Sequence, residues 1–446
     1  MTASSAPWSS NDWPAIWTEQ RFDDAVRPIK TVTVVVPAYG RQDALEGTLA
    51  SLARQTYPSG LIDVVVADDG SDPPLDPTAP DGLSVKVVAQ ERDRFGLARA
   101  RNTGAAQATG DIIAFVDADM VPEEVWVEAH ALLHHLHPWL LAVGPRVHVT
   151  DRSVEARADF SSKRIREVFA GKEVFRPEWI YDYWATHDDG RVGSDNVWKV
   201  TSGGNLSVSR ELFDAVGGFD RDSFTRYGGE DNDFGYRALQ LGAYVLPAWR
   251  AVAWHLGHGT FARDDIDEIL ADARLVLASR IPDYGLPRVA GVHHVTPDLV
   301  IEIRAAGVSA TDLVRVVGDT LCGMASLSIA FVVVGADPEV EVVLRQAVGT
   351  DPRIVIGWDA VPERWRFTPI VLESPPVAWP EAKLRRILIS VREGRSAEMR
   401  IIVPEYDYPA VARLTRIVRQ VERGMIDSTA VFSRFGGRWG SYDDLS

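Results

Sequence analysis

The fold class is decided by residues 31–71, TVTVVVPAYGRQDALEGTLASLARQTYPSGLIDVVVADDGS. Two runs of β-branched residues stand at the ends of this stretch and flank a segment with helical periodicity, which predicts a β-α-β unit. The apolarity of both runs is continuous, as expected of parallel strands that are buried on both faces. Further apolar runs at 85–90 and 111–119, with a helical pattern over 97–108 between them, extend the unit. The sequence therefore predicts a doubly wound, mostly parallel α/β sheet.

The composition is that of an ordinary globular chain. Its 446 residues are 46% hydrophobic and 25% charged, which suggests two or three domains. The 47 basic and 63 acidic residues give a net charge of -16, so we expect no nucleic-acid partner. The single cysteine, Cys322, excludes an intramolecular disulfide and a thiolate metal cluster, and it favours a cytoplasmic location. No run approaches the roughly 18 apolar residues of a membrane span, so only peripheral membrane contact is expected.

The pattern along the chain divides it into three regions. Residues 1–30 are rich in Ser, Pro and Trp and predict an N-terminal arm, and residues 31–285 predict the first α/β domain. Residues 286–446 alternate helical and strand patterns, with a helix expected over 410–424, and predict a second, smaller α/β domain. Within it, residues 326–359 loosely repeat the opening of the chain without its acidic motifs. This region is interpreted as a degenerate duplicate with a role in acceptor binding or in homodimer formation.

The expected strands end in residues that can carry chemistry. In doubly wound sheets, ligands bind beyond the carboxyl ends of the strands. Three such ends here are Pro37-Ala38-Tyr39, Asp68-Asp69-Gly70-Ser71 and Asp117-Ala118-Asp119. Asp117 and Asp119 alternate along a strand, so their carboxylates point to the same side. Two like charges this close favour a divalent cation shared with ligand phosphates, although two solvated loop aspartates would look the same.

A second acidic pair follows a glycine-rich segment. Gly228 and Gly229 precede Glu230 and Asp231, which open a predicted helix. The helix dipole lowers carboxylate pKa values at this end, and the backbone N–H groups there lack partners. A helix cap needs only one acidic residue, so the pair behind two glycines indicates a ligand that approaches closely, with one carboxylate acting as a general base.

These motifs together resemble the family 2 glycosyltransferases of the GT-A fold, which transfer sugar from a nucleotide-sugar donor. The resemblance runs from Thr31 to about Asp264. It rests on VVVPAYGRQDALEGTLASLARQTYP, VVVADDGSD, GLARARNTGAAQATGDIIAFVDAD and GGEDNDFGYR, which stand in the family's order and spacing. The SGGN and GGEDNDFGYR segments look most like the branch with the bacterial chondroitin-type polymerases and the galactosyltransferase C-terminal motif.

The resemblance implies a role for each matching position. The residues implied to bind the nucleotide sugar are Pro37, Tyr39, Asp68, Asp69, Arg101, Asp117, Gly203 and Gly204. Asp117, Asp119 and His255 would bind Mn2+ or Mg2+, with His258 as the rival imidazole. Imidazole beside carboxylates favours Mn2+ by ligand softness. Asp231 would deprotonate the acceptor hydroxyl, and Glu230 would orient the sugars.

The implied reaction is transfer of a hexose or N-acetylhexosamine from a UDP-sugar to a hydroxyl of a carbohydrate or glycosylated acceptor. One general base on the face opposite the leaving group implies single displacement and therefore inversion. A retaining transferase and an inactive nucleotide-sugar-binding module stay open as alternatives. A nucleotidyltransferase is disfavoured, because the chain lacks a glycine-rich basic loop near its N-terminus.

Three further groups of residues carry weaker signals. The basic run of Arg92, Arg94, Arg99 and Arg101 is expected to place one or two side chains near the phosphates. Four histidines at helical spacing, His130, His134, His135 and His137, are interpreted as a solvated helix face. The aromatic segment 175–198, with Trp179, Tyr181, Tyr183, Trp184 and Trp198, fits an acceptor-binding loop and core packing equally well.

Overall fold

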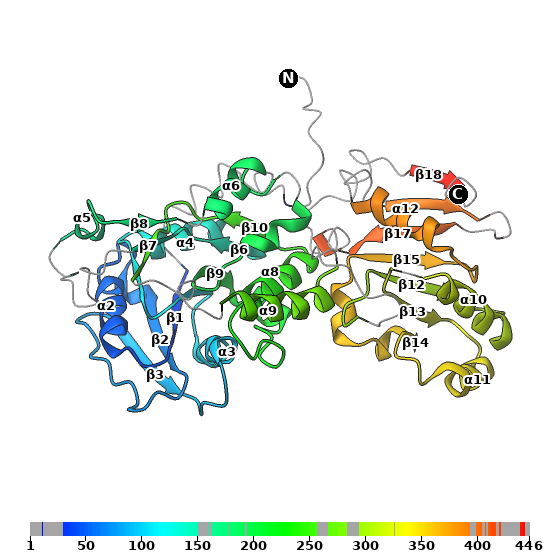
Figure 1. Cartoon of the computed structure of the whole chain (residues 1–446), viewed down its shortest axis with the longest axis horizontal. Coiled ribbons are helices and arrows are strands. Elements are labelled where there is room, and N and C mark those ends of the chain that lie inside the picture. Colours follow the sequence, from blue (N-terminus) through cyan, green and yellow to red (C-terminus); the bar gives the residue numbers. More distant parts are fainter. Residues whose placement is uncertain are drawn as a thin grey trace, which may run out of the picture. The chain divides into compact units, whose positions relative to one another are not determined.

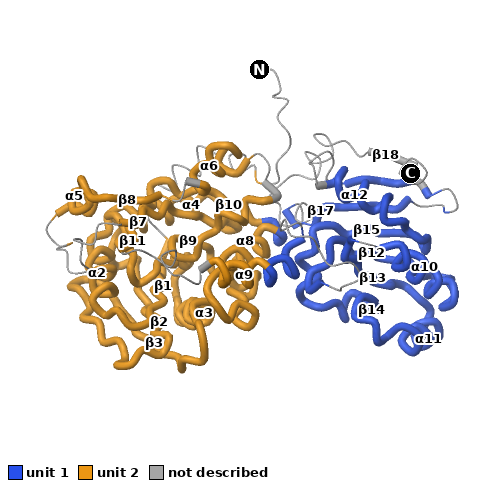
Figure 2. Tube along the Cα trace, in the orientation of Figure 1, with its two compact units in different colours: residues 1–10, 240–242, 275–446 blue, residues 11–239, 243–274 orange. Residues whose placement is uncertain are grey.

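The computed structural model describes most of the chain between residues 30 and 415. The described residues are 11, 30–149, 160, 163–176, 178–191, 194–256, 266–282, 294–324, 326–392, 398–403, 406, 409–415, 419–420 and 438–441. The predicted arm, apart from residues 11 and 30, and His258 lie outside this set. The described chain forms two compact units, one with residues 11–239 and 243–274 and the other with 240–242 and 275–446 (Figure 2). None of the described helices is both long and apolar enough to cross a membrane.

The first unit is built on a seven-stranded sheet (Figure 1). Its strands, in spatial order, are β10 (Tyr244–Pro247), β6 (Leu140–Val143), β9 (Asn205–Ser209), β4 (Ile112–Val116), β1 (Val32–Ala38), β2 (Ile62–Asp68) and β3 (Ser84–Ala89). Only β9 runs antiparallel to its neighbours. Every residue of β1 is buried, which is why its apolar run is continuous. The predicted mostly parallel α/β sheet is confirmed.

Helices and a second, smaller sheet complete this unit. The helices are α2 (Gln42–Leu52), α3 (Leu97–Gln107), α4 (Trp126–Leu136), α5 (Ile165–Val168), α6 (Glu178–Thr186), α7 (Arg210–Val216) and α8 (Glu230–Gln240), and α9 (Ile266–Arg280) follows them. The four-stranded sheet has the order β5 (Met120–Pro122), β11 (Ala253–Leu256), β7 (Arg146–Val149) and β8 (Val174–Phe175). In it His255 of β11 pairs with His148 of β7, so two imidazoles stand side by side.

The histidines of α4 are not a solvated face, and that interpretation was wrong. His130 and His134 are fully buried against β9. His134 Nε2 lies 2.8 Å from Ser207 Oγ, Ser207 Oγ lies 2.8 Å from His130 Nδ1, and His130 Nε2 lies 3.0 Å from Asn205 Oδ1. A single proton order satisfies this chain: His134 donates to Ser207, Ser207 to His130, and His130 to Asn205, with both rings neutral. Burial accordingly lowers the pKa of His130 to about 4 and that of His134 to about 3.

Asn205 anchors the glycine-rich loop to this buried series of hydrogen bonds. Its Oδ1 also accepts the indole N–H of Trp126 at 2.8 Å. Its Nδ2 donates to the carbonyl oxygens of Pro145 at 2.9 Å and Ala251 at 2.8 Å. All the hydrogen-bonding capacity of the amide is used, so Asn205 is held rigidly, and the preceding Gly203-Gly204 pair starts from a fixed point.

The second unit holds another seven-stranded sheet. Its spatial order is β18 (Arg438–Ser441), β16 (Glu398–Ile402), β17 (Ala410–Leu414), β15 (Ile370–Ser374), β12 (Leu299–Arg304), β13 (Ile329–Val334) and β14 (Ile354–Ile356). Its helices are α10 (Ala310–Cys322), α11 (Pro338–Val348) and α12 (Glu381–Arg392). The helix predicted over 410–424 is wrong at its start, because residues 410–414 pair antiparallel with both β15 and β16.

The two seven-stranded sheets share one topology. Taken in chain order, β12 to β18 occupy the same sheet positions as β1, β2, β3, β4, β6, β9 and β10. Corresponding pairs of neighbouring strands are parallel in both sheets or antiparallel in both. Each sheet has one strand, β9 in the first and β17 in the second, that is antiparallel to both of its neighbours. The counterpart of the opening strand β1 is therefore β12. The repeat predicted from the sequence, residues 326–359, instead pairs the opening of the chain with the apolar run that forms β13.

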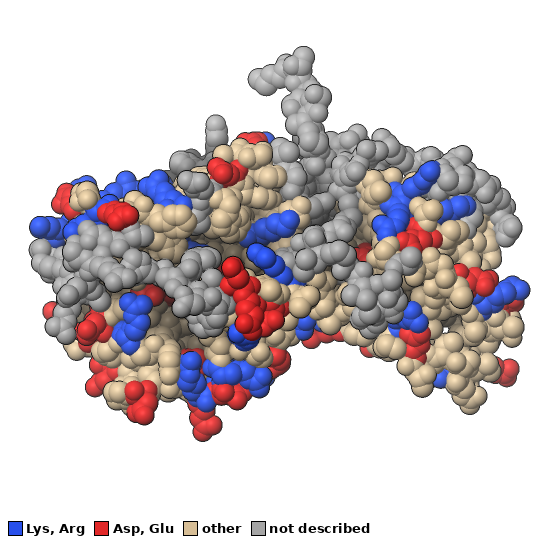
Figure 3. Space-filling view, viewed as in Figure 1, with Lys and Arg blue, Asp and Glu red and all other residues tan. Residues whose placement is uncertain are grey.

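Charged side chains are spread over the surface. On the face shown in Figure 3, acidic and basic side chains of the described residues are interspersed. Local clusters, rather than one broad surface of a single sign, therefore decide which ligands this face attracts.

Candidate active site

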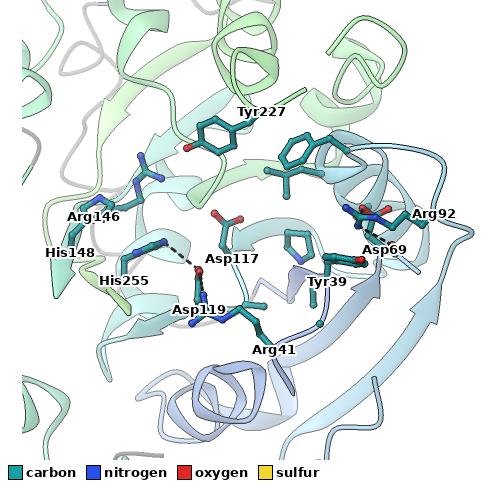
Figure 4. A pocket seen from close by; sticks show the side chains of 17 residues that line it. Tyr39, Arg41, Asp69, Arg92, Asp117, Asp119, Arg146, His148, Tyr227 and His255 are labelled. Carbon is teal, nitrogen blue, oxygen red and sulfur yellow. Dashed lines mark hydrogen bonds and ion pairs between the residues drawn. The ribbon is translucent and has the colours of Figure 1, made fainter. Parts of the chain in front are cut away.

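A cavity of about 250 Å³ opens beyond the carboxyl ends of β1, β2 and β4 (Figure 4). It is lined by Pro37, Ala38, Tyr39, Gly40, Arg41, Asp69, Arg92, Phe95, Leu97, Ala100, Asp117, Ala118, Asp119, Arg146, His148, Tyr227 and His255. Six of the predicted site residues are in this set: Pro37, Tyr39, Asp69, Asp117, Asp119 and His255. The sheet topology explains the convergence, because the ends of neighbouring parallel strands meet at one edge.

One side of the cavity is a stacked platform. The Arg92 guanidinium carbon lies 3.3 Å from the ring centroid of Tyr39, whose side chain is exposed. Arg92 Nη1 donates to Asp69 Oδ2 at 3.1 Å, and Gln90 Nε2 donates to Asp69 Oδ1 at 2.6 Å. The buried Asp69 carboxylate thus holds Arg92 against the Tyr39 ring. A flat aromatic and guanidinium surface of this kind suits a planar heterocycle such as uracil.

Asp68 does not reach the cavity. Its Oδ1 accepts from the backbone N–H of Ser71 at 2.9 Å and from Ser71 Oγ at 2.6 Å, and its Oδ2 accepts from the backbone N–H of Leu75 at 3.0 Å. Both oxygens of this buried carboxylate therefore close the loop after β2. In the structure Asp69 faces the cavity, and Asp68 shapes the loop that presents it.

Asp119 and His255 form the part of the cavity suited to a cation. Asp119 Oδ2 accepts from Arg41 Nη1 at 3.1 Å, and Asp119 Oδ1 lies 3.4 Å from His255 Nε2. The rings of His255 and His148 lie 4.7 Å apart. Carboxylate oxygen with imidazole nitrogen is a donor set that fits Mn2+. As the side chains stand, no three acidic, His or Cys groups within the described ranges converge closely enough to hold a metal ion.

Arg101 joins the two acidic motifs. Its Nη2 donates to Asp117 Oδ1 at 3.0 Å, and its Nη1 donates to Glu230 Oε1 at 2.9 Å. Arg101 and Glu230 are both buried, so each gives the other a charged partner in the interior. Burial, and then the neighbouring Asp231, raise the pKa of Glu230, against the opposing effect of Arg101. This bridge joins α3 to the end of β4 and the start of α8.

The Gly203-Gly204 pair lies against this bridge. A Cβ atom at Gly203 would lie 2.5 Å from the Arg101 guanidinium, and one at Gly204 would lie 2.4 Å from Asp117 Oδ2. Only glycine fits at either position without moving these charged groups. The backbone N–H of Gly203 also donates to Asp231 Oδ2 at 3.2 Å, while Asp231 Oδ1 accepts from the N–H of Asn232 at 2.8 Å. Backbone groups therefore position the Asp231 carboxylate at the N-terminus of α8.

Not every predicted residue lines the cavity. Arg101, Gly203, Gly204, Glu230 and Asp231 lie behind or beside it and are connected to it through the Arg101–Asp117 pair. Among the other arginines of the basic run, Arg92 lines the cavity, whereas Arg99 lies 3.8 Å from Asp69 and Arg94 pairs with Asp93.

The cavity residues that sequence reasoning missed include four with charged, imidazole or phenol side chains: Arg41, Arg146, His148 and Tyr227. Arg146 and His148 alternate on a short strand after the apolar run of β6, the same signal that identified Asp117 and Asp119. Tyr227 directly precedes the Gly228-Gly229 pair, and Arg41 comes two residues after Tyr39.

Family comparison identifies the first unit as a glycosyltransferase domain. Residues 33–192 match the family described as glycosyl transferase family 2, and residues 192–246 match the family described as the N-terminal domain of galactosyltransferase. The chain thus carries a family 2 glycosyltransferase domain, and the resemblance found from its motifs is confirmed.

Two curated relatives and one solved structure are similar to parts of the chain. The chain is 30% identical to a chondroitin synthase of Escherichia coli over 57% of its own length and 39% of that protein. It is 31% identical to a validoxylamine A glucosyltransferase of Streptomyces hygroscopicus subsp. limoneus over 50% of each chain. A crystal structure of GalNAc-T7 with UDP, GalNAc and Mn2+ aligns with a TM-score of 0.40 at 17% identity, over 58% of this chain and 50% of that one. The chain therefore spans half or less of the length of these relatives.

Proposed function

We propose that this chain is a metal-dependent, inverting glycosyltransferase. It transfers a hexose or an N-acetylhexosamine from a UDP-sugar to a hydroxyl of a carbohydrate or glycosylated acceptor. The observation that carries the proposal is the Arg101 bridge, which ties Asp117 at the cavity to the Glu230-Asp231 pair. A structural ion pair would need one carboxylate, whereas this bridge links the two acidic motifs that donor binding and base catalysis require.

The donor half of the proposal rests on the stacked platform and on the nearby arginines. Uracil would lie along Tyr39 and Arg92, with Asp69 accepting a hydrogen bond from the nucleoside. Arg41, Arg92 and Arg146 line the same cavity and supply positive charge for a diphosphate in a protein whose net charge is -16. Guanidinium groups bind phosphate oxygens through two parallel N–H donors, which fixes orientation as well as charge.

The cation would be held by Asp117, Asp119 and His255, and Mn2+ suits these ligands better than Mg2+. When bound, such a cation stabilises the negative charge that develops on the departing diphosphate. Arg41 now occupies Asp119 Oδ2 and would have to release it.

The acceptor half of the proposal rests on Asp231. The N–H of Gly203 donates to Asp231 Oδ2 at 3.2 Å and so holds the carboxylate in place at the N-terminus of α8, where a general base can be positioned. Asp231 would take the proton of the acceptor hydroxyl as that oxygen attacks the anomeric carbon. Glu230, held by Arg101, would orient the sugars. A single base opposite the leaving diphosphate leads to inversion.

The test combines donor binding with turnover. A panel of UDP-sugars is screened for Mn2+-dependent release of UDP, and UDP binding is measured by calorimetry. Asp117→Ala and Asp119→Ala should lose Mn2+-dependent UDP binding, whereas Asp231→Asn should bind UDP and lose transfer. Equal turnover in all three variants would contradict these roles, and no UDP affinity in the parent protein would favour an inactive module. NMR of the product's anomeric proton separates inversion from retention.

A further inference from the structure

A second hollow lies next to the donor cavity in the first unit. It is narrow and is lined by Val143, Gly144, Pro145, Arg146, Ile180, Tyr181, Trp184, Val200, Ser202 and Trp249. Arg146 lines both the hollow and the donor cavity. In Figure 4 the Arg146 side chain lies at the edge of the donor cavity opposite Arg92. Arg146 therefore borders both spaces.

An aromatic surface borders the hollow. The rings of Tyr181 and Trp249 are stacked, with centroids 6.0 Å apart and an interplanar angle of 29°. Trp249 nevertheless remains 42% exposed, which is unusual for so large an apolar side chain. Its indole N–H donates to Asp189 Oδ1 at 3.2 Å, so the ring is fixed in orientation while its surface stays open to solvent.

The turn that carries Asp189, the hydrogen-bond partner of Trp249, has a strained backbone. Asp188 and Asp189 have φ angles of 49° and 52°, a left-handed conformation that costs energy for residues other than glycine. A strained backbone persists only where the surrounding contacts hold it, and such positions cluster at ligand-binding sites. Here it presents the Asp189 carboxylate to the indole of Trp249.

Two polar groups in the hollow lack hydrogen-bond partners. Ser202 Oγ and the Nε–H of Arg146 are buried, and neither has a partner within the described part of the chain. Ser202 as a residue is only 4% exposed. A buried polar group without a partner is destabilising, and hydroxyl groups of a bound ligand are partners of the kind that each of these atoms lacks.

The hollow also leads to the proposed base. Ser202 precedes Gly203, whose N–H donates to Asp231 Oδ2. A ligand held by Ser202 would therefore lie next to the loop that positions the Asp231 carboxylate. The aromatic surface and the unpartnered donors thus border one hollow, and the adjacent residue Gly203 contacts the proposed base.

We propose that Tyr181 and Trp249 form a subsite for the acceptor sugar. A pyranose ring would lay its apolar C–H face on the exposed Trp249 surface, and its hydroxyls would bind Ser202 and Arg146. This inference rests on the proposed function. It also divides the aromatic segment predicted from the sequence: Trp184 and Trp198 are core residues, whereas Tyr181 joins Trp249, which lies outside that segment.

The test measures sugar binding separately from donor binding. The probes are the methyl β-glycosides of glucose, galactose, N-acetylglucosamine, N-acetylgalactosamine and glucuronic acid. Their binding is followed by saturation-transfer NMR with UDP and Mn2+ present, and UDP affinity is measured by calorimetry on the same samples. Trp249→Ala and Tyr181→Ala should each weaken glycoside binding at least about tenfold at unchanged UDP affinity. Tyr181→Ala guards against a folding defect peculiar to the first variant.

Trp358→Ala is a matched control. Trp358 is 43% exposed, and its indole N–H also donates to a carboxylate, Glu302 Oε2, at 2.7 Å, but it belongs to the second unit. The Trp358→Ala variant should bind glycosides as the parent protein does. Parental glycoside binding in both Trp249→Ala and Tyr181→Ala overturns the subsite, as does failure of every glycoside to bind a parent protein that binds UDP. Failure of the parent to bind UDP instead overturns the proposed function itself.

Discussion

The buried histidines of α4 make the stability of the first unit sensitive to mild acid. In the unfolded chain a histidine titrates near 6.5, whereas burial lowers the pKa of His130 to about 4 and that of His134 to about 3. Between these limits the unfolded chain binds protons that the folded chain does not. The contribution of the two neutral rings to the free energy of unfolding is therefore complete well above pH 6.5. It is lost as the pH falls toward the pKa values that the rings have in the folded chain.

The size of the loss follows from the titration of the unfolded chain. Between pH 7 and pH 5.5 a histidine with a pKa of 6.5 goes from about one-quarter to about nine-tenths protonated. The linked free energy is about 1.2 kcal/mol for each histidine that stays neutral in the folded state. Both folded-state pKa values lie well below 5.5, so the two rings together contribute about 2.5 kcal/mol.

Hydrogen exchange measures this loss where it arises. Amides of α4 and β9 are followed by mass spectrometry at pH 7 and pH 5.5, with correction for the intrinsic exchange rates. The part of the fall in opening free energy that comes from the α4 histidines should be about 2.5 kcal/mol in the parent and about half as much in His134→Gln, whose amide can still donate to Ser207. His148, with its pKa lowered to about 3, affects both proteins equally. The same loss in parent and variant would refute the reasoning.

Three further perturbations test the bridge and the platform. Gly204→Ala places a Cβ 2.4 Å from Asp117 Oδ2 and should weaken Mn2+-dependent UDP binding about tenfold or more by calorimetry. Gly60→Ala, with nothing within 4 Å, should not. Arg101→Met leaves the buried Glu230 carboxylate without its partner and should destabilise the unit by about 3–5 kcal/mol in urea unfolding; a loss below about 1 kcal/mol would contradict the bridge. Tyr39→Ala removes the ring under Arg92 and should weaken UDP binding about fivefold, with unchanged affinity excluding the platform.

The parallel sheet and its acidic edge could be predicted because both signals are local. A strand buried on both faces must be apolar throughout, and the run of β1 shows this directly. The carboxylates of Asp117 and Asp119 follow such a strand, so the position of the strand places them at the sheet edge. No contact between distant segments had to be known. The same logic would have found Arg146 and His148, had the short strand β7 been recognised.

The buried histidines could not be predicted, because their partners are distant in sequence. Spacing by four residues places His130 and His134 on one face of α4, but it does not show what that face meets. The partners Asn205 and Ser207 lie on β9, more than 70 residues away. The helix predicted from residue 410, where the structure has the strand β17, was wrong for a related reason. The helical pattern from residue 410 is overridden by pairing with β15 and β16 on both sides.

The second unit shows that the sheet alone does not make the site. Its seven strands repeat the topology of the first sheet, yet residues 357–369, all described, form short 3₁₀ turns where the first unit has α3 between its third and fourth strands. That helix carries Arg101. At the end of the fourth strand, Glu373 pairs with Arg304 and Arg413 and is followed by Ser374 and a proline. Without the helix and the paired carboxylates, nothing in these segments can join a cation site to a base. We therefore expect the proposed chemistry to depend on α3 and the strand ends and to reside in the first unit alone.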